Sequence, residues 1–195
     1  MGGVDKASIE IAGATMLDRV LAAVRPVCHR LIVVGPARDT GVPAVVFLEE
    51  PAPGGGPVPA VAAGLAAAGD ADPVLVLAAD LPVLVEGDVR RLLELLATDP
   101  AIDAAAAVDH RGLPNPLLAA YRRDALAPAA GAGAAGAPAA GLLPDRVGTV
   151  DLGPDATLNV NRPAELARAV ALLRSGRGRG PGGYRAGHGS PGGRT

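Results

Sequence analysis

An alternation of strand-like and helix-like segments along most of the chain is the feature that most restricts its fold. The clearest strand is residues 74–79, a continuous apolar run of the kind found in strands buried on both faces of a parallel sheet. Strands that alternate with helices form βαβ units with right-handed crossovers. The sequence therefore predicts an α/β fold with a mostly parallel sheet.

Apolar spacing and turn residues locate the other elements. The helix expected at Met16–Val24 begins with a capping box formed by Thr15 and Asp18. The helix expected at 163–173 should take Asn161 as its N-cap, because the arginine that follows is a poor one. Further strands are expected at 31–34, 42–48, 101–108, 117–121 and 147–152, and further helices at 60–68 and 87–97.

One domain, over residues 1–173, is expected from a chain of 195 residues. The remaining residues, 174–195, hold five arginines and no acid, with too few apolar side chains to fold, so we expect a disordered tail. A second low-complexity stretch, 128–141, is nearly all Ala, Gly and Pro. It is expected to form a surface insertion or an Ala-rich helix, with Pro128 and Pro138 breaking any long helix.

Composition and charge argue against several classes of function. Aromatic residues make up only 2% of the chain, which disfavours a surface that stacks nucleic-acid bases. The body before the Arg-rich tail is acidic, which also disfavours nucleic-acid binding, and an RNA-binding role for the tail is a minor alternative. No apolar run or leader suggests a membrane or secretion, and the single Cys28 is typical of a reducing compartment. We therefore expect a cytoplasmic protein.

Three segments offer candidate ligand-binding residues near the carboxyl ends of predicted strands, where open α/β sheets bind ligands. Asp80 directly follows the most apolar strand and is placed either to hold Mg²⁺ or to form the turn before Leu81. The glycine-rich loop at 49–57 precedes a helix and either approaches an anion or base edge closely, or is an ordinary surface loop. Lys6 offers a compact charge for a phosphate, or belongs to a solvated terminus.

Taken in order, the motifs of this chain resemble those of the molybdenum cofactor guanylyltransferase family, within the MobA-like nucleotidyltransferases. Each motif is modest alone, but six in the same order are specific, and they extend over nearly all of residues 1–173. They are Met1-Gly-Gly-Val-Asp-Lys, the helix and strand within 17–34, Pro53-Gly-Gly-Gly-Pro57, Ala79-Asp-Leu-Pro82, Pro114-Asn-Pro-Leu-Leu-Ala-Ala-Tyr121 and Asn159-Val-Asn-Arg-Pro-Ala-Glu-Leu166.

The resemblance implies a Rossmann-like three-layer αβα sandwich that transfers GMP from GTP to a molybdopterin phosphate and releases pyrophosphate. It implies two catalytic residues: Lys6, which would neutralise the triphosphate, and Asp80, which would hold the Mg²⁺ cofactor. The implied partners are GTP, a molybdopterin-type acceptor and molybdoenzyme maturation proteins, with no nucleic acid or membrane. The other implied contacts are Gly2, Gly3, Gly35, Glu50, Gly56 and Pro57 for the nucleotide, and Asn115, Asn159 and Asn161 for the acceptor.

The sequence departs from the family pattern most clearly at its start, where the first strand and the body of the glycine-rich loop do not precede Met1. We therefore expect a sheet without its first strand, from a start assigned too late in the gene or from a true truncation. Glu50 also stands where the family usually has Asp, which leaves base selectivity open. The alternatives are a molybdopterin cytidylyltransferase, a guanylyltransferase for another phosphorylated small molecule, or a catalytically dead relative that binds pterin.

Overall fold

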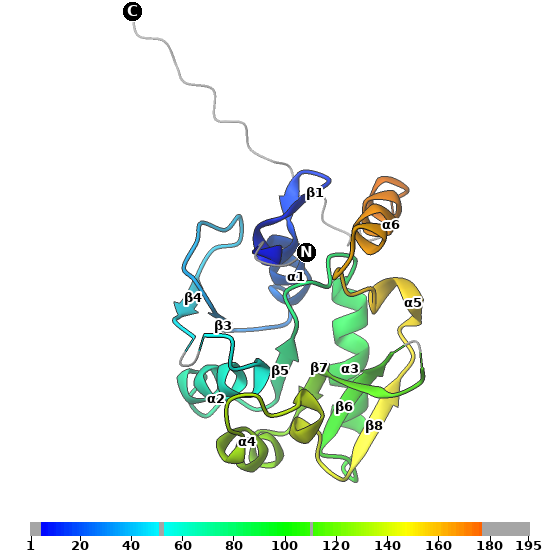
Figure 1. Cartoon of the computed structure of the whole chain (residues 1–195). Helices are drawn as coiled ribbons and strands as arrows, with labels where there is room; N and C mark the ends of the chain where they lie inside the picture. Colours follow the sequence, from blue (N-terminus) through cyan, green and yellow to red (C-terminus); the bar gives the residue numbers. More distant parts are fainter. Residues whose placement is uncertain (1–4, 51–52, 110, 177–195) are drawn as a thin grey trace, which may run out of the picture.

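The main sheet of the protein has four strands and a mixed topology (Figure 1). A computed structural model describes residues 5–50, 53–109 and 111–176. Strand β7 is antiparallel to both β5 and β6, whereas β8 is parallel to β6, so three of the four strands share one direction. The α/β fold is therefore confirmed, but two of the three ladders of this sheet are antiparallel, because a short turn joins β6 to β7 and reverses the chain. In sheet order the strands are β5 (Val74–Leu77), β7 (Pro114–Tyr121), β6 (Ala104–Val108) and β8 (Val147–Val150).

A separate pair of parallel strands, β3 (Leu31–Val34) and β4 (Val45–Leu48), lies beside the main sheet. Side chains of both strands pack into the same hydrophobic cluster as side chains of β5. Within the described residues, however, no hydrogen-bonded ladder joins β3 to β5. Among the described residues, the sheet is therefore interrupted between these two strands.

Helices cover both faces of the main sheet, which confirms the three-layer arrangement (Figure 1). Alternate residues of β6 and β7 point to opposite faces, as strand geometry requires. One face packs against α1 (Met16–Val24) and α3 (Glu86–Thr98), and the other against α2 (Pro57–Ala67) and α4 (Arg123–Ala132). The four consecutive alanines of β6 are fully buried, and their small side chains let both helical layers lie close to the sheet.

A third hydrophobic cluster joins the first described residues to the last helix. It includes Ile11, Met16, Val160 and Leu173. The elements at this end are the short helix η1 (Lys6–Ser8), the hairpin of β1 (Glu10–Ile11) and β2 (Ala14–Thr15), and the helices α5 (Gly153–Ala156) and α6 (Pro163–Arg174). Segments from the two ends of the sequence therefore meet at one edge of the molecule, as Figure 1 shows for β1 and α6.

Two helix starts were predicted from capping residues, with different outcomes. The capping box of α1 is confirmed, because Thr15 Oγ1 accepts a hydrogen bond from the Asp18 amide at 3.0 Å. The Asn161 cap is wrong, since α6 is capped at Arg162. The Glu165 carboxylate reaches back instead and accepts the amides of Asn161 at 2.6 Å and Arg162 at 2.8 Å. An acceptor inside the first turn thus replaces the missing one at the cap.

The low-complexity stretch 128–141 takes part in α4 and in a short helix η2 (Ala139–Leu142). The expected break at Pro128 is wrong, because α4 runs through this exposed proline, which forfeits only one backbone hydrogen bond. Pro138 lies beyond the end of α4 and caps η2. Ala130 and Leu142 are buried against the sheet, so the stretch completes one helical layer.

The observed strands and helices otherwise overlap the predicted ranges, with ends displaced by a few residues. No helix in the described parts of the chain has the length and apolarity needed to cross a membrane. The predicted disordered tail beyond residue 176, and the expected nucleotide contacts Gly2 and Gly3, lie outside the described residues.

Candidate active site

Three segments that are far apart in the sequence bring polar side chains together at one edge of the molecule. The Lys6 ammonium of η1 lies 3.9 Å from Asp80 Oδ2, just beyond β5. It also donates a hydrogen bond to Asn161 Oδ1, across 155 positions of sequence. The Asn161 amide group donates in turn to Asn159 Oδ1. The structure therefore joins both expected catalytic residues to two of the expected acceptor-binding residues.

The backbone around Asn159 and Asn161 is fixed from two sides. The Val160 amide donates to the Asp80 carbonyl at 3.0 Å, and the Val160 side chain is fully buried in the third hydrophobic cluster. The two asparagines flank this buried valine; the Asn161 side chain meets Lys6, and the Asn159 side chain bonds Asn161 and Asp80. Glu165 holds the Asn161 amide from the helix side. These contacts fix the backbone from which the two amide side chains extend.

Asp80 is an unusual carboxylate because it is mostly buried and only partly paired. Its side chain is 18% exposed. Burial raises the pKa of Asp80 above its ordinary value, although the Lys6 charge and a hydrogen bond from Asn159 act in the opposite direction. Its Oδ1 atom is buried and has no hydrogen-bond partner among the described residues. Such an oxygen carries a desolvation cost that a bound cation would offset.

The donor set at Asp80 suits a hard cation that keeps most of its ligands from water and substrate. No group of three His, Cys, Asp or Glu side chains within the described residues is arranged to hold a metal ion. Mg²⁺ is commonly bound through one or two carboxylates together with substrate phosphates. The unpartnered Asp80 oxygen therefore fits a magnesium–phosphate complex, and a metal cage made only of described side chains does not form here.

Lys6 owes its position to a small network around Arg38, in the loop that follows β3. The Arg38 Nη1 atom donates to Asp5 Oδ2 at 2.6 Å and to Ser8 Oγ at 2.8 Å, so it binds both ends of η1. Ser8 Oγ donates to the same Asp5 oxygen at 2.8 Å. Burial acts to raise the pKa of Asp5, but the Ser8 hydrogen bond and the Arg38 charge outweigh it and hold that pKa below its ordinary value. Arg38 is thus a residue with a structural role at the site that sequence reasoning missed, since no local pattern links it to Lys6.

Asn115, the third expected acceptor contact, lies at the same end of the sheet as Asp80. The β5–β7 ladder ends with the Ala78 amide donating to the Leu117 carbonyl at 2.8 Å. Asp80 and Asn115 each lie two residues beyond this bond, on adjacent strands that run in opposite directions. The Asn115 side chain accepts the Leu117 amide at 2.9 Å, so its carbonyl oxygen is used locally. Its amide nitrogen remains the group with which it would contact a ligand.

A second carboxylate, Asp109, ends β6 at this edge and was not among the predicted residues. It accepts the amides of Arg111 at 2.8 Å and Leu113 at 3.0 Å, and so shapes the turn into β7. It lines a hollow of about 310 Å³ together with Asp151, Thr157 and neighbouring residues. The same signal that identified Asp80, an acid directly after an apolar strand, would have identified Asp109.

The expected nucleotide contacts outside the Lys6–Asp80 pair lie on β3, β4 and the loop before α2. The Gly35 amide donates to the Leu48 carbonyl at 2.8 Å, which ties the end of β3 to the segment that carries Glu50. Gly56 caps α2 with a φ of +82°, a conformation that favours glycine, and Pro57 opens the helix. No hydrogen bond or ion pair among the described residues joins these four residues to Lys6 or Asp80.

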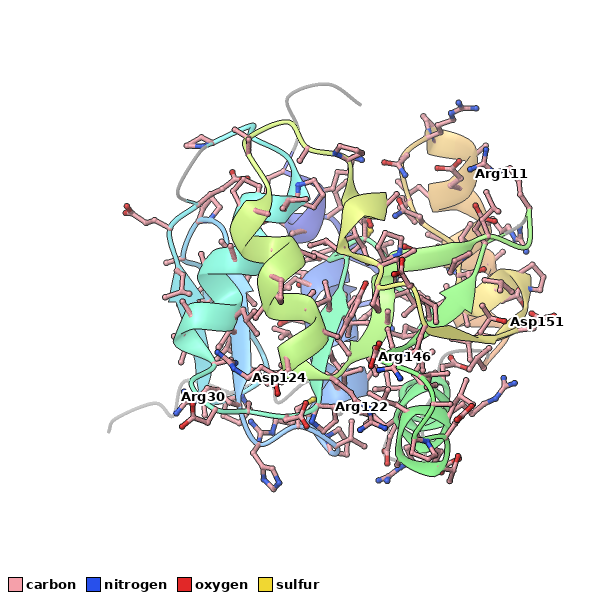
Figure 2. The ribbon with its side chains drawn as sticks, turned by 90° about the horizontal axis from the view of Figure 1, so that it is seen from below. Arg30, Arg111, Arg122, Asp124, Arg146 and Asp151 are labelled. Atoms are coloured by element: carbon pink, nitrogen blue, oxygen red, sulfur yellow. The ribbon has the colours of Figure 1, made fainter. Side chains whose placement is uncertain are left out.

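Another charged hollow, of about 390 Å³, lies at the opposite edge of the sheet. Figure 2 looks onto this edge and shows Arg122, Asp124 and Arg146 there. The Arg122 guanidinium is engaged by the carbonyls of Ile102 and Leu96, at 3.0 and 3.1 Å. Arg146 forms two hydrogen bonds with one carboxylate, that of Asp103, at 2.6 and 2.8 Å. The Arg122 and Arg146 guanidinium groups therefore hold loops in place at this edge.

Comparison with known proteins identifies the family of the chain. The chain is 32% identical over 191 residues to a probable molybdenum cofactor guanylyltransferase of Chloroflexus aggregans, with 88% of each chain covered. Among solved structures, 2-C-methyl-D-erythritol 4-phosphate cytidylyltransferase of Thermus thermophilus matches with a TM-score of 0.65 and 25% identity, covering 87% of this chain and 93% of that one. Molybdopterin-guanine dinucleotide biosynthesis protein A of Archaeoglobus fulgidus matches with a TM-score of 0.64 and 20% identity, covering 89% and 92%. The family model of the MobA-like NTP transferase domain matches residues 1–143. The chain therefore belongs to the family of MobA-like NTP transferase domains.

Proposed function

We propose that this protein is a molybdenum cofactor guanylyltransferase, which transfers GMP from GTP to a molybdopterin phosphate and releases pyrophosphate. The family and the name of the Chloroflexus relative support this activity. The observation that carries it is the convergence of Lys6, the partly paired Asp80 and two asparagines at one edge of the sheet. A cation, an unsatisfied carboxylate and neutral amides suit a polyphosphate that is bound beside a polar acceptor.

The chemistry asks mainly for positioning and charge stabilisation. An oxygen of the acceptor phosphate attacks the α-phosphorus of GTP, the bond to the bridging oxygen breaks, and pyrophosphate leaves with that oxygen. Lys6 would leave Asp80 and bind the triphosphate, where its charge stabilises the developing negative charge. Asn159 and Asn161 would orient the acceptor so that its oxygen lies in line with the leaving group. Mg²⁺ held by Asp80 would supply further neutralisation of the phosphates.

The remaining assignments follow from this activity. Gly35, Glu50, Gly56 and Pro57 would line the nucleotide, and Asn115 would contact the acceptor. Gly2 and Gly3 are proposed as phosphate contacts from the sequence motif alone. The domain is proposed to extend over residues 1–173, and the protein to act in the cytoplasm, where molybdoenzyme maturation proteins would receive its product.

A pyrophosphate-release assay with a molybdopterin acceptor and either GTP or CTP tests the proposal. We expect Mg²⁺-dependent turnover that prefers GTP and is abolished by chelation of the metal. Asp80→Ala should eliminate turnover, whereas the matched variant Asp124→Ala, at an exposed carboxylate in the first turn of α4, should not. Equal use of GTP and CTP would contradict the guanine assignment, and preference for CTP would indicate a molybdopterin cytidylyltransferase. If pyrophosphate were released only with another phosphorylated acceptor, the molybdopterin assignment would be wrong and that acceptor would be the substrate.

The interruption of the sheet between β3 and β5 favours a second candidate, a relative that binds pterin without turnover. In that case the acceptor would bind, but no pyrophosphate would appear at any metal concentration. Metal-dependent turnover that is lost in Asp80→Ala excludes this candidate.

A further inference from the structure

The connection between α4 and η2, residues 133–138, lies directly against the glycine loop at 53–56. The Gly136 amide donates a hydrogen bond to the Gly55 carbonyl at 2.6 Å. Next to this bond, the Ala137 carbonyl oxygen lies 3.9 Å from the position that a Cβ on Gly56 would take. The two backbones therefore run side by side, and Gly55 is buried between its neighbours.

Two glycines of the connection are required for this contact, each for a different reason. A Cβ on Gly133 would collide with the Cγ1 methyl of Val58, which is only 2% exposed at the start of α2. Gly136 has a φ of +84°, a conformation that strains other residues, although a Cβ there would meet nothing within 4 Å. Gly133 thus allows α4 to approach α2 closely, and Gly136 turns the chain so that its amide faces the loop.

Residues on both sides of the connection are buried in the hydrophobic core. The connection leaves α4 just after the buried Ala130 and enters η2 just before the buried Leu142, and both side chains pack with Val58 in one hydrophobic cluster. Figure 1 shows α4 beside α2 on the same side of the sheet. The glycine loop leads into Gly56, the cap of α2, so its conformation sets the direction of the first amides of that helix.

We propose that residues 133–138 are a positioning element that fixes the glycine loop and thereby sets which nucleotide base the enzyme accepts. The element acts through the Gly136–Gly55 hydrogen bond and does not itself take part in the reaction. This inference rests on the proposed function, because it concerns the loop that would frame the base.

The test compares three glycine-to-alanine variants by steady-state kinetics with GTP and CTP. Gly136→Ala should strain the connection, raise the KM for GTP about tenfold and lower the preference for GTP over CTP, with kcat within about twofold. Gly133→Ala should act in the same direction, and Val58→Ala in the same chain should partly restore the preference by removing the colliding methyl. The matched control is Gly131→Ala, an exposed position in α4 where a Cβ meets nothing within 4 Å, and it should keep wild-type values.

Hydrogen–deuterium exchange of peptides from residues 53–65 separates failure of this inference from failure of the proposed function. Gly136→Ala should speed exchange there, whereas Gly131→Ala should not, whether or not the protein turns over GTP. If both variants exchange like the wild type, or if Gly136→Ala keeps the wild-type ratio of GTP to CTP use, the positioning role is wrong. The melting temperature of each variant is also measured. A lowered value would indicate general unfolding, which would lower the apparent kcat for both nucleotides equally.

Discussion

At the scale of single residues, Asp80 is a candidate ligand-binding residue that lowers the stability of the folded protein. Its carboxylate is mostly buried, and one of its oxygens has no partner among the described residues. Burial raises its pKa above the ordinary value, even with Lys6 nearby. A raised pKa means that ionisation of Asp80 destabilises the folded chain at neutral pH. The desolvation of the Asp80 carboxylate therefore destabilises the unliganded protein, and a bound cation with its phosphates would offset this effect.

We predict that Asp80→Asn will stabilise the protein at pH 7 and lower kcat about 100-fold or more. The stabilising effect should shrink as the pH falls, because wild-type Asp80 itself becomes protonated below its raised pKa and its ionisation penalty disappears. Thermal melts of both proteins between pH 4 and 8 would check the direction. A wild type that is more stable than the variant at pH 7 would show that Lys6 outweighs the burial.

Arg38 leads to a prediction about a residue that acts through another. Arg38→Ala removes the contacts to Asp5 and Ser8 that hold η1, so Lys6 should lose its fixed position. We expect kcat/KM for GTP to fall about tenfold, since small errors in the placement of a charged group are costly to catalysis. Arg90→Ala serves as the control, because the partner of that exposed arginine among the described residues is Glu86, one turn away on α3. Equal kinetics for the two variants would remove Arg38 from the site.

At the scale of elements, the capping box of α1 gives a prediction that does not involve the site. Thr15→Ala deletes the oxygen that accepts the Asp18 amide, so the variant should lose about 1 kcal/mol of unfolding free energy. Thr15→Ser keeps that oxygen and should lose much less. Urea denaturation of the three proteins measures the difference. A loss shared by both variants would instead indicate that the Thr15 methyl group provides the stability.

The elements also show what the sequence could predict and what it could not. Apolar spacing and the Thr15–Asp18 pair located α1, because those signals act within one turn. The cap of α6 was misassigned because its acceptor, Glu165, lies inside the helix. The Gly136–Gly55 hydrogen bond has no local signal at all, since it depends on how α4 packs against α2.

Site residues follow the same rule. Asp80, Asn159 and Asn161 were identified from short motifs, and the structure brings them together with Lys6. Asp109 carries the same strand-end signal as Asp80, and was overlooked because no motif was recognised there. Arg38 could not have been found, since its role arises only when the loop after β3 lies beside η1.

At the scale of the whole molecule, the interrupted sheet divides the hydrogen-bonded framework into two parts. β3 and β4 are joined to each other, and β5–β8 form their own ladders, while only side-chain packing connects the two groups among the described residues. Cooperative units of this kind open independently, with lower free energies where fewer backbone bonds hold them. We predict that native-state hydrogen exchange will be faster for the amides of β3 and β4 than for those of β6 and β7. Equal protection factors would show that side-chain packing alone makes the sheet one unit.

The division has a consequence for ligand affinity. Gly35 and Glu50 belong to the part built on β3 and β4, whereas Asp80 and Asn115 belong to the main sheet. A nucleotide that contacts both parts, as we propose, would hold them together non-covalently. Some of its binding free energy would be spent on suppressing fluctuations of the weaker part, so the ligand should slow exchange in β3 and β4 more than elsewhere. The affinity for the nucleotide and the local stability of β3 and β4 would then be thermodynamically linked, so that a change in one changes the other.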